Sequence, residues 1–461
     1  MNSRILRGKG ERANNPVSME ERGSADVPLV SVAPLNRFRM EHLAWLFLFL
    51  NLIRLLPRGQ EVTGLDPHSA YRILLVVFAS VLVVLNLVGN GRSVANLFKF
   101  PLLFLFAYSL AALGSTLSAS VAFYSMWKAI EVLVLAGTVA ALLGLPNRDM
   151  VALKTYRITI VLVGVMCFSP WLSAMISPAE AFRPQSGLIP VMLSGIIPPM
   201  NPNTVGFMSS ITSLLLLIRV IRYKNKRAIY GALFLAAIIT LLLSNSRTGL
   251  AAFVLGVVVY SIADNKKRIA AIVAVLGVVV ATVGPVREMA GQYLQRGQHI
   301  ESIKTMSGRT NTWQVAYDYF KASPYVGHGF ASAGRFDLLG NKSSHLHGSI
   351  FEVMVGLGLM GMIPWLLWVI ITGILLFSAW FKTRAGPSLA ARSMTAEWMG
   401  VYVILIVRSA TSSGLYAHNI ETMLFCSLMM LVMANSWRHT SNFLDKDKNV
   451  LLGKKPFLAA K

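Results

Sequence analysis

The chain has 461 residues, of which 55% are hydrophobic and only 14% are charged. Soluble globular domains carry about a quarter charged residues, so this composition argues against a soluble enzyme and favours a membrane protein. The net charge of +23 at pH 7 would suggest nucleic-acid binding in a soluble protein, but basic residues in short loops orient the helices of a membrane protein, so no nucleic-acid partner is expected.

Residues 1–40 are polar and arginine-rich and contain no apolar core. A cleavable signal peptide requires such a core, so none is expected here, and the segment is predicted to be a disordered basic tail in the cytoplasm. Residues 41–437 are predicted to form one membrane domain in contact with lipid, and residues 438–461 a second basic cytoplasmic tail.

Apolar runs of membrane-spanning length recur through the predicted membrane domain. Each can cross a hydrocarbon layer of about 30 Å as a helix. Lipid is spanned by helices or by closed barrels, and these runs lack the alternation of barrel strands. The predicted fold class is therefore all-α, a polytopic membrane helical bundle of about 12 transmembrane helices, at residues 43–56, 73–89, 97–117, 121–145, 155–176, 204–222, 228–245, 248–263, 268–285, 355–381, 397–415 and 418–437.

The charges of the loops predict the orientation of these helices. Basic residues follow every even-numbered span, in loops that contain Arg92, Arg148, Arg222, Lys266 and Lys382. Lys and Arg accumulate in cytoplasmic loops, so both termini are expected in the cytoplasm.

One long segment, residues 286–354, is then expected outside the cytoplasm, between the ninth and tenth spans. A connection of this length is uncommon in a helical bundle and suggests function. Trp313, Tyr317 and Phe320 recur within it at helical spacing, which predicts an interfacial or lid helix, or a helix packed on the bundle. A second outer loop, residues 177–203, is rich in proline and is predicted to be a rigid irregular cap.

Ionisable residues in and beside the predicted spans gather toward the outer leaflet. Such residues are costly in lipid and are by default functional hypotheses. Each also has an ordinary explanation: an ion pair on one helix face, an arginine that extends to the interface, or a histidine whose hydrogen bonds are satisfied. The set comprises Lys128, Glu131, Arg247, Arg309, His347, Arg408, His418 and Glu421.

Arginine at the outer headgroup level has a specific use. Its planar guanidinium binds phosphate oxygens in bidentate fashion and stays charged at any relevant pH. Two such arginines can hold a diphosphate. A histidine nearby, whose ordinary pKa is about 6.5, can accept a proton from an attacking hydroxyl.

Nucleotide and metal binding are disfavoured near His347. Residues 356–361 spell G-x-G-x-x-G, but a dinucleotide fingerprint follows a strand in a βαβ unit, whereas small residues in an apolar run let membrane helices approach closely. His345 and His347 lack an evident third metal ligand. Cys167 and Cys426 both lie in apolar runs, so neither a disulfide framework nor a zinc cluster is expected, and no metal or cofactor is predicted.

Several short motifs follow one another along this part of the chain. They are NPN at residues 201–203, SNSRTG at 244–249, SGRTNTW at 307–313 and SPYVGHGF at 323–330. His347 comes next, followed by Gly358 and Gly361. Their order and spacing resemble the bacterial O-antigen ligase and O-antigen (exopolysaccharide) polymerase family over roughly residues 200–380. The family elements are a Ser-Arg-(Thr/Gly)-Gly turn, a Gly-Arg and Trp element, a Pro-x-x-Gly-x-Gly element and a His-Asn-x9-Gly-x-x-Gly signature.

The resemblance implies glycosyl transfer from a polyprenyl-diphosphate-linked glycan to an acceptor hydroxyl. It places a multi-pass protein in the bacterial inner membrane, with its active site facing the periplasm. In ligases the acceptor is a sugar of the lipid A-core of lipopolysaccharide, and in polymerases it is another carrier-linked repeat unit. Carried over by position, His347 matches the essential histidine of the family, and Arg247 and Arg309 match its arginines.

One departure concerns the residue after the histidine, because Gly348 stands where the family has Asn, Ser or Gln. The orienting role of that side chain then falls to another group, for which Ser349 is a candidate. His345 is an alternative catalytic histidine, but only His347 has the glycine spacing. Further supporting residues are sought among Lys128, Glu131, Arg408 and His418.

The sequence thus leads to a hypothesis of metal-independent transfer, in which Arg247 and Arg309 clamp the diphosphate and His347 acts as base. Direct displacement would invert the anomeric centre. Ligase and polymerase both remain open, since residues 309–330 look slightly more like a polymerase, whereas a single large outer segment is typical of a ligase. The non-enzymatic alternative is a transporter of a small anion or glycan, although transporters place coupling residues near the membrane midplane.

Overall fold

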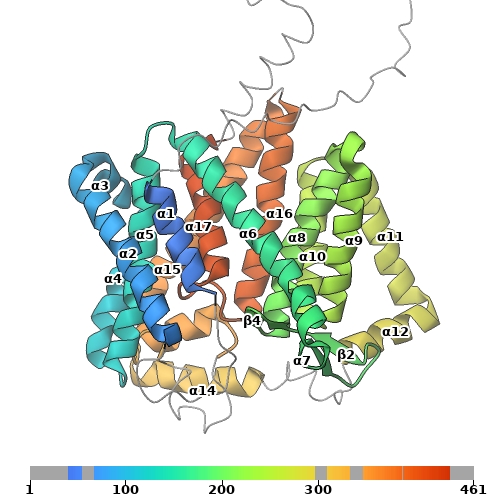
Figure 1. Cartoon of the computed structure of the whole chain (residues 1–461), viewed down its shortest axis with the longest axis horizontal. Helices are drawn as coiled ribbons and strands as arrows, with labels where there is room; N and C mark the ends of the chain where they lie inside the picture. Colours follow the sequence, from blue (N-terminus) through green and yellow to red (C-terminus); the bar gives the residue numbers. More distant parts are fainter. Residues whose placement is uncertain (1–39, 54–66, 296–308, 333–345, 387, 437–461) are drawn as a thin grey trace, which may run out of the picture.

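Long apolar runs fold as helices in this chain because lipid offers no partner for an unpaired backbone group. The computed structural model describes residues 40–53, 67–295, 309–332, 346–386 and 388–436, which form a helical bundle with a few short strands (Figure 1). The prediction of an all-α polytopic membrane protein is confirmed at this level. Apart from Met40, both predicted tails lie outside the described residues, as does His345.

The first half of the described chain builds one side of the bundle and a small cap. Its helices are α1 (Met40–Asn51), α2 (Pro67–Gly89), α3 (Gly91–Leu97), α4 (Leu102–Gly114), the 3-10 turn η1 (Ser115–Ser118), α5 (Ala122–Gly144), α6 (Arg148–Ile176) and α7 (Pro178–Ala181). Its strands are β1 (Phe182–Pro184), β2 (Val191–Leu193), β3 (Gly195–Ile196) and β4 (Pro199–Met200).

The second half completes the bundle. Its elements are α8 (Pro202–Arg222), η2 (Lys224–Lys226), α9 (Arg227–Leu243), α10 (Arg247–Ala263), α11 (Lys267–Thr282), α12 (Gly284–Gln295), α14 (Arg309–Ala322), α15 (Ser349–Ala385), α16 (Leu389–Thr411) and α17 (Ile420–Met433).

Seven of the described helices are long and apolar enough to cross a membrane, or up to nine if each of two bent pairs counts as one span. The bent pairs are α3 with α4, at 79°, and α11 with α12, at 93°. Pro101 precedes α4 and Pro285 lies in the first turn of α12, where proline interrupts the preceding helix. The count of twelve stays a prediction, since α1, α10 and α17 have only 12, 17 and 14 residues.

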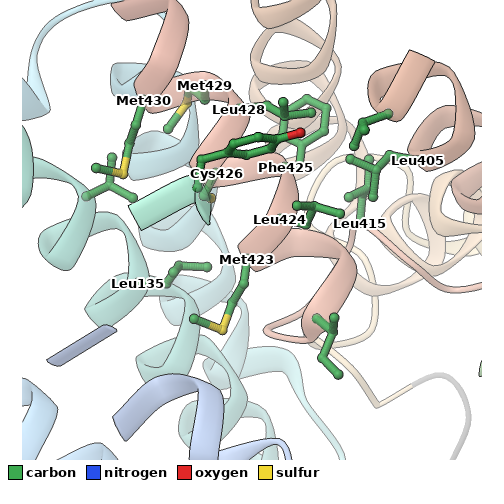
Figure 2. Packing of buried hydrophobic residues seen from close by; sticks show 14 of the residues in the cluster. Leu135, Leu405, Leu415, Met423, Leu424, Phe425, Cys426, Leu428, Met429 and Met430 are labelled. Atoms are coloured by element: carbon green, nitrogen blue, oxygen red, sulfur yellow. The ribbon is translucent and has the colours of Figure 1, made fainter. Parts of the chain in front are cut away.

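Helix α17 lies in the protein core and not against lipid. Residues 420–432 are all buried, as expected for a helix that is hydrophobic on every face. In Figure 2, Leu135 from α5 and Leu405 from α16 lie close to the α17 side chains Met423 and Leu424. The core of the bundle therefore surrounds α17.

The cap at residues 177–203 is more regular than predicted. It contains α7 and two antiparallel strand pairs, β1 with β2 and β3 with β4. The Ser173 hydroxyl at the end of α6 accepts hydrogen bonds from the backbone N–H groups of Ile196 and Ile197, at 3.0 and 3.1 Å. These contacts fix the cap to the bundle. Because the cap contains paired strands, the expectation of an irregular segment was wrong.

Helix α14 lies across the same end of the bundle as the cap and α12 (Figure 1). It confirms the helical spacing of Trp313, Tyr317 and Phe320. The Trp313 ring stacks on Phe351 of α15 with 4.9 Å between ring centroids, while Tyr317 is 47% exposed. Helix α14 is therefore packed on the bundle along one side and open along another.

Candidate active site

The turn before α10 fixes the position of Arg247. Ser246 caps α10, and its hydroxyl accepts a hydrogen bond from the Gly249 N–H at 3.2 Å. The Ser210 hydroxyl on α8 donates to the Gly249 carbonyl at 2.7 Å. A Cβ atom at Gly206 would lie 2.2 Å from the Ser246 Cβ, so only glycine permits this approach of α8. Arg247 is consequently the first residue of a helix whose start is held against the bundle.

Backbone carbonyls hold two of the predicted arginines. Arg309 begins α14, and its Nη1 donates to the carbonyl of Thr411, the last residue of α16, at 2.8 Å. Arg247 donates from Nη2 to the carbonyl of Gln295 at 3.2 Å. A carbonyl orients a guanidinium but carries no net charge, so these two bonds fix the side chains without neutralising them.

The backbone at His347 is held in a left-handed conformation, with φ of 54°. Such a conformation costs about 1 kcal/mol or more in a residue other than glycine and persists where neighbours over-determine it. The preceding residue supplies that restraint. The Leu346 N–H donates to Glu352 Oε1, and Trp313 Nε1 donates to the Leu346 carbonyl, both at 2.9 Å. Ser413 in turn donates to Glu352 Oε1 at 2.7 Å.

Arg309 and Arg408 lie near His347, and Arg247 lies near Arg309. Burial lowers the pKa of His347 below its ordinary 6.5, and the positive charges of Arg309 and Arg408 lower it further. Burial also lowers the pKa of Arg309, with additional contributions from Arg408 and Arg247. The side chains that influence one another therefore come from α10, α14, α16 and the turn before α15, and burial and the arginines both favour the neutral form of His347.

Arg408 is the most buried of these arginines, with 7% of its surface exposed. Its Nε lies 3.5 Å from Glu421 Oε1, and its guanidinium lies over the Phe207 ring, 5.9 Å from the centroid. Glu421 can therefore balance the charge of Arg408. Arginines gathered in this way favour a bound anion, and arginine is suited to phosphate oxygens.

The glycine-rich sequences meet each other beside this group of residues. Helix α15 breaks at Gly358, whose φ is 56°. The backbone of residues 324–329 fills the break, with four hydrogen bonds of 2.8 to 3.1 Å: His328 N to Val355 O, Gly329 N to Gly356 O, Leu359 N to Pro324 O and Met360 N to Tyr325 O.

The glycines are required for this approach, because there is no space for a side chain. A Cβ atom at Gly327 would lie 2.5 Å from the Gly356 backbone, and one at Gly358 would lie 2.5 Å from the Tyr325 backbone. The expected close approach is therefore present, but the partner of α15 is the loop after α14 and not a second helix. The loop joins α14, which begins with Arg309, to α15, which follows His347.

Residues 232–366 match the family model described as O-antigen ligase. The resemblance inferred from the motifs is thereby confirmed. This O-antigen ligase segment is less than a third of the 461 residues and runs from α9 into the first part of α15. It includes Arg247, Arg309 and His347, whereas Arg408 lies beyond it. No curated protein matches the chain.

A second polar cluster, which we call the Glu131 cluster, lies outside the O-antigen ligase segment. Glu131 is fully buried in α5 and is surrounded by Lys128 Nζ at 2.8 Å, Arg72 Nη2 at 3.5 Å and His418 Nδ1 at 3.8 Å. Asn51 donates to Glu131 Oε1 at 3.2 Å. The predicted pairing of Lys128 with Glu131 is present, and His418 shares their environment.

A pocket of about 270 Å³ opens on the Glu131 cluster. Its lining includes Arg72, Lys128, His418 and Glu421. Glu421 also pairs with Arg408. The structure thus brings the predicted residues into two groups, one around His347 and one around Glu131, which meet at Glu421.

Two further predicted residues have different outcomes. The Ser349 hydroxyl donates to the Ser412 carbonyl at 3.2 Å and accepts from the Leu415 N–H at 2.9 Å, so it joins the start of α15 to the turn after α16. His345 lies outside the described residues. Within the described ranges, no three His, Cys, Asp or Glu side chains gather as metal ligands would.

Sequence reasoning missed Arg72 and Glu352. Arg72 lies one residue before a predicted span, and Glu352 lies three residues before another. Glu352 falls in the predicted outer segment, residues 286–354, although it is 3% exposed within α15. An acidic residue one helical turn from Ser349, at the start of an apolar helix, was the available signal.

Proposed function

We propose that this protein transfers a glycan from a polyprenyl-diphosphate carrier to an acceptor hydroxyl, at the end of the bundle where α14 lies. The observation that carries the proposal is that Arg309 and Arg408 lie near enough to His347 to lower its pKa, and that Arg247 lies near Arg309. The match to the O-antigen ligase family supports enzymatic activity of the ligase or polymerase type.

In the proposed reaction, Arg247 and Arg309 bind the diphosphate of the donor. The bond between the anomeric carbon and the diphosphate oxygen breaks, and the departing lipid diphosphate keeps the electron pair. Its gain of negative charge is the largest charge change in the reaction, so donors fixed beforehand at this place lower the barrier. The backbone carbonyl of Thr411 orients Arg309 without neutralising its charge, which supports binding of the diphosphate by this residue.

His347 is the proposed general base. The acceptor hydroxyl oxygen attacks the anomeric carbon, and its proton passes to the imidazole. Burial and the nearby arginines lower the pKa of His347, so the imidazole is neutral and able to accept that proton at pH 7. A single displacement of this kind inverts the configuration of the anomeric carbon.

The Glu131 cluster is the proposed acceptor side of the site. Its pocket shares Glu421 with the arginine group, and Lys128 and Arg72 suit an anionic group on the acceptor. Lys128, Glu131, Arg408 and His418 would then act as supporting residues. Ser349 would act through the backbone around His347, since its hydroxyl is engaged by the turn after α16.

The proposed orientation places the α14 end in the periplasm of a bacterium and the protein in the inner membrane. The loops between α8 and α9 and between α10 and α11 lie at the opposite end (Figure 1). They contain Lys224, Lys226, Arg227, Lys266 and Lys267. Basic loops of this kind favour the cytoplasmic side.

The test is replacement of His347 by Ala in the source bacterium, with Arg287→Ala as control. Arg287 is an exposed residue of α12 at the same end of the bundle. At equal membrane abundance, H347A should abolish the glycan product and R287A should leave it intact. A bare lipopolysaccharide core with accumulated carrier-linked polymer would identify a ligase, and single repeat units would identify a polymerase. Full product from H347A would remove His347 from the mechanism.

A further inference from the structure

A second strongly basic pocket lies at the end of the bundle opposite α14. It has a volume of about 320 Å³ and opens between α6, α8, α16 and the end of α10. Its lining holds five cationic side chains, Arg157, Arg219, Arg222, Lys266 and Arg392, against two carboxylates, Asp264 and Glu397. We call it the basic pocket.

The carboxylate of Glu397 already accepts hydrogen bonds from three residues that line the pocket. It is 3% exposed, and its carboxylate accepts from Arg219 Nη1 at 2.8 Å, from Arg222 Nη1 at 3.3 Å and from the Tyr156 hydroxyl at 3.3 Å. These contacts use both oxygens of the carboxylate. Glu397 therefore has little capacity to balance the remaining cations of the pocket.

Asp264 is also engaged. It is 3% exposed, lies 3.7 Å from Lys266 Nζ and 3.6 Å from Arg392 Nε, and accepts from Ser393 at 3.0 Å and from Tyr260 at 3.1 Å. Two carboxylates thus face five cations, and the pocket keeps a surplus of positive charge.

Donors remain unused in this pocket. The Nε atom of Arg222 is buried and has no hydrogen-bond partner among the residues that the structure describes. The buried Nε of Arg392 also makes no hydrogen bond there, and its 3.6 Å contact with Asp264 is an ion pair only. Arg157 is exposed, and within the described ranges it forms neither an ion pair nor a hydrogen bond. Buried guanidinium N–H groups are costly to leave unpaired, so their presence indicates a ligand that accepts hydrogen bonds.

A wider groove of about 780 Å³ adjoins the basic pocket and shares Ile221 and Lys266 with it. Arg227, Lys267 and Arg268 add further positive charge, while Val220 and Ile269 supply apolar walls. Positive charge beside apolar walls at the end of a membrane bundle suits a molecule with an anionic head and a hydrocarbon tail.

We propose that the basic pocket binds a phosphate group, with Arg157, Arg222 and Arg392 as hydrogen-bond donors. The shared chemistry is a phosphate oxygen, carried either by an anionic phospholipid or by a soluble phosphate. The adjoining groove favours the lipid, whose acyl chains would follow Val220 and Ile269. This site lies at the other end of the molecule from His347 and does not depend on the proposed transfer reaction.

The test uses the full chain purified in detergent and measures binding by native mass spectrometry. The probes are phosphatidylglycerol, phosphatidylcholine and inorganic phosphate. The variant is R157Q with R392Q. The matched control is K382Q with R384Q, which removes two exposed cations at the same end of the bundle that do not line either pocket.

The wild type and the control should bind phosphatidylglycerol about a hundredfold more tightly than the R157Q/R392Q variant does, because the variant loses two charge-assisted hydrogen bonds and each contributes about a factor of ten. Phosphatidylcholine should bind less well than phosphatidylglycerol. Binding of inorganic phosphate, with the same dependence on the arginines and no binding of the lipid, would support the site and identify a soluble anion as its ligand.

Equal affinity of the variant and the wild type for both phosphatidylglycerol and inorganic phosphate would overturn the proposal. If R157Q/R392Q does not fold, R157Q alone is used, since its exposed side chain tolerates replacement. R157Q must then bind phosphatidylglycerol more weakly than the K382Q control does, and unchanged binding would overturn the proposal.

Discussion

The two ends of this bundle both gather arginines, but they hold them in different ways. At the basic pocket, Arg219 and Arg222 pair with the carboxylate of Glu397. At the α14 end, Arg408 also pairs with a carboxylate, that of Glu421, but Arg309 is oriented by the backbone carbonyl of Thr411. A carboxylate fixes and neutralises an arginine, whereas a carbonyl fixes it and leaves its charge. The comparison suggests that Arg219 mainly stabilises the fold and that Arg309 mainly serves a substrate.

The largest expected effect is the loss of transfer activity in R309Q. Removing a charge that stabilises a departing diphosphate should lower the rate of glycan transfer by about 10²–10³-fold. R309K keeps the charge but loses the planar fork, and should lie between R309Q and the wild type. The measurement is transfer from a lipid-diphosphate-linked donor in proteoliposomes. Equal transfer rates for R309Q and the exposed-site control R287Q would contradict the inference that Arg309 mainly serves a substrate.

The next effect is on stability and concerns Arg219. R219Q leaves the buried carboxylate of Glu397 with a weaker set of partners, which should cost about 3 kcal/mol of folding free energy. Transfer activity per folded molecule should change little. The double variant R219Q/E397Q should recover most of the loss, because it also removes the buried negative charge. Thermal unfolding in detergent measures both, and no recovery in the double variant would show that Arg219 acts through other contacts.

The sequence nominated site residues where a motif fixed both residue type and spacing. Arg247, Arg309 and His347 were predicted on one face of the membrane, and in the structure Arg309 lies near His347 and Arg247 lies near Arg309. The role of each residue stays a prediction. Arg72 was not identified from the sequence because it lies at the edge of an apolar run. The position of a helix end depends on tertiary contacts, such as the hydrogen bond from Arg72 to the Asn51 carbonyl.

The fold was predictable in class but not in its interruptions. Hydropathy located the apolar runs, because the same apolar surface that lipid requires is visible in the composition. It did not reveal that α15 breaks at Gly358 or that residues 182–200 form paired strands. Both depend on partners distant in the sequence: Tyr325 for the break, and Ser173 for the cap.

A smaller effect is expected from Gly358, whose break positions the loop after α14. G358A would place a Cβ atom 2.5 Å from the Tyr325 backbone in a left-handed conformation, and should cost about 2 kcal/mol. The control is G277A in α11, where a Cβ atom meets nothing within 4 Å. Helix propensity should make the control neutral or slightly stabilising. Unfolding midpoints give the comparison, and equal stability of G358A and G277A would contradict the role assigned to the break.

The smallest effect is a shift in the pH dependence of transfer, and it probes the surplus charge at the α14 end most directly. Burial and the charges of Arg309 and Arg408 lower the pKa of His347 below 6.5, so the neutral base predominates at pH 7. Activity should therefore be constant above pH 6.5 and should fall, as pH decreases, at the lowered pKa of the imidazole. R309Q removes one repulsive charge and so raises the pKa of His347. The acidic limb in the pH profile of the residual R309Q activity should therefore move to higher pH. R384Q, at the opposite end, should leave the limb in place. A wild-type limb above pH 6.5, or a downward shift in R309Q, would show that the arginines do not act on His347 in this way.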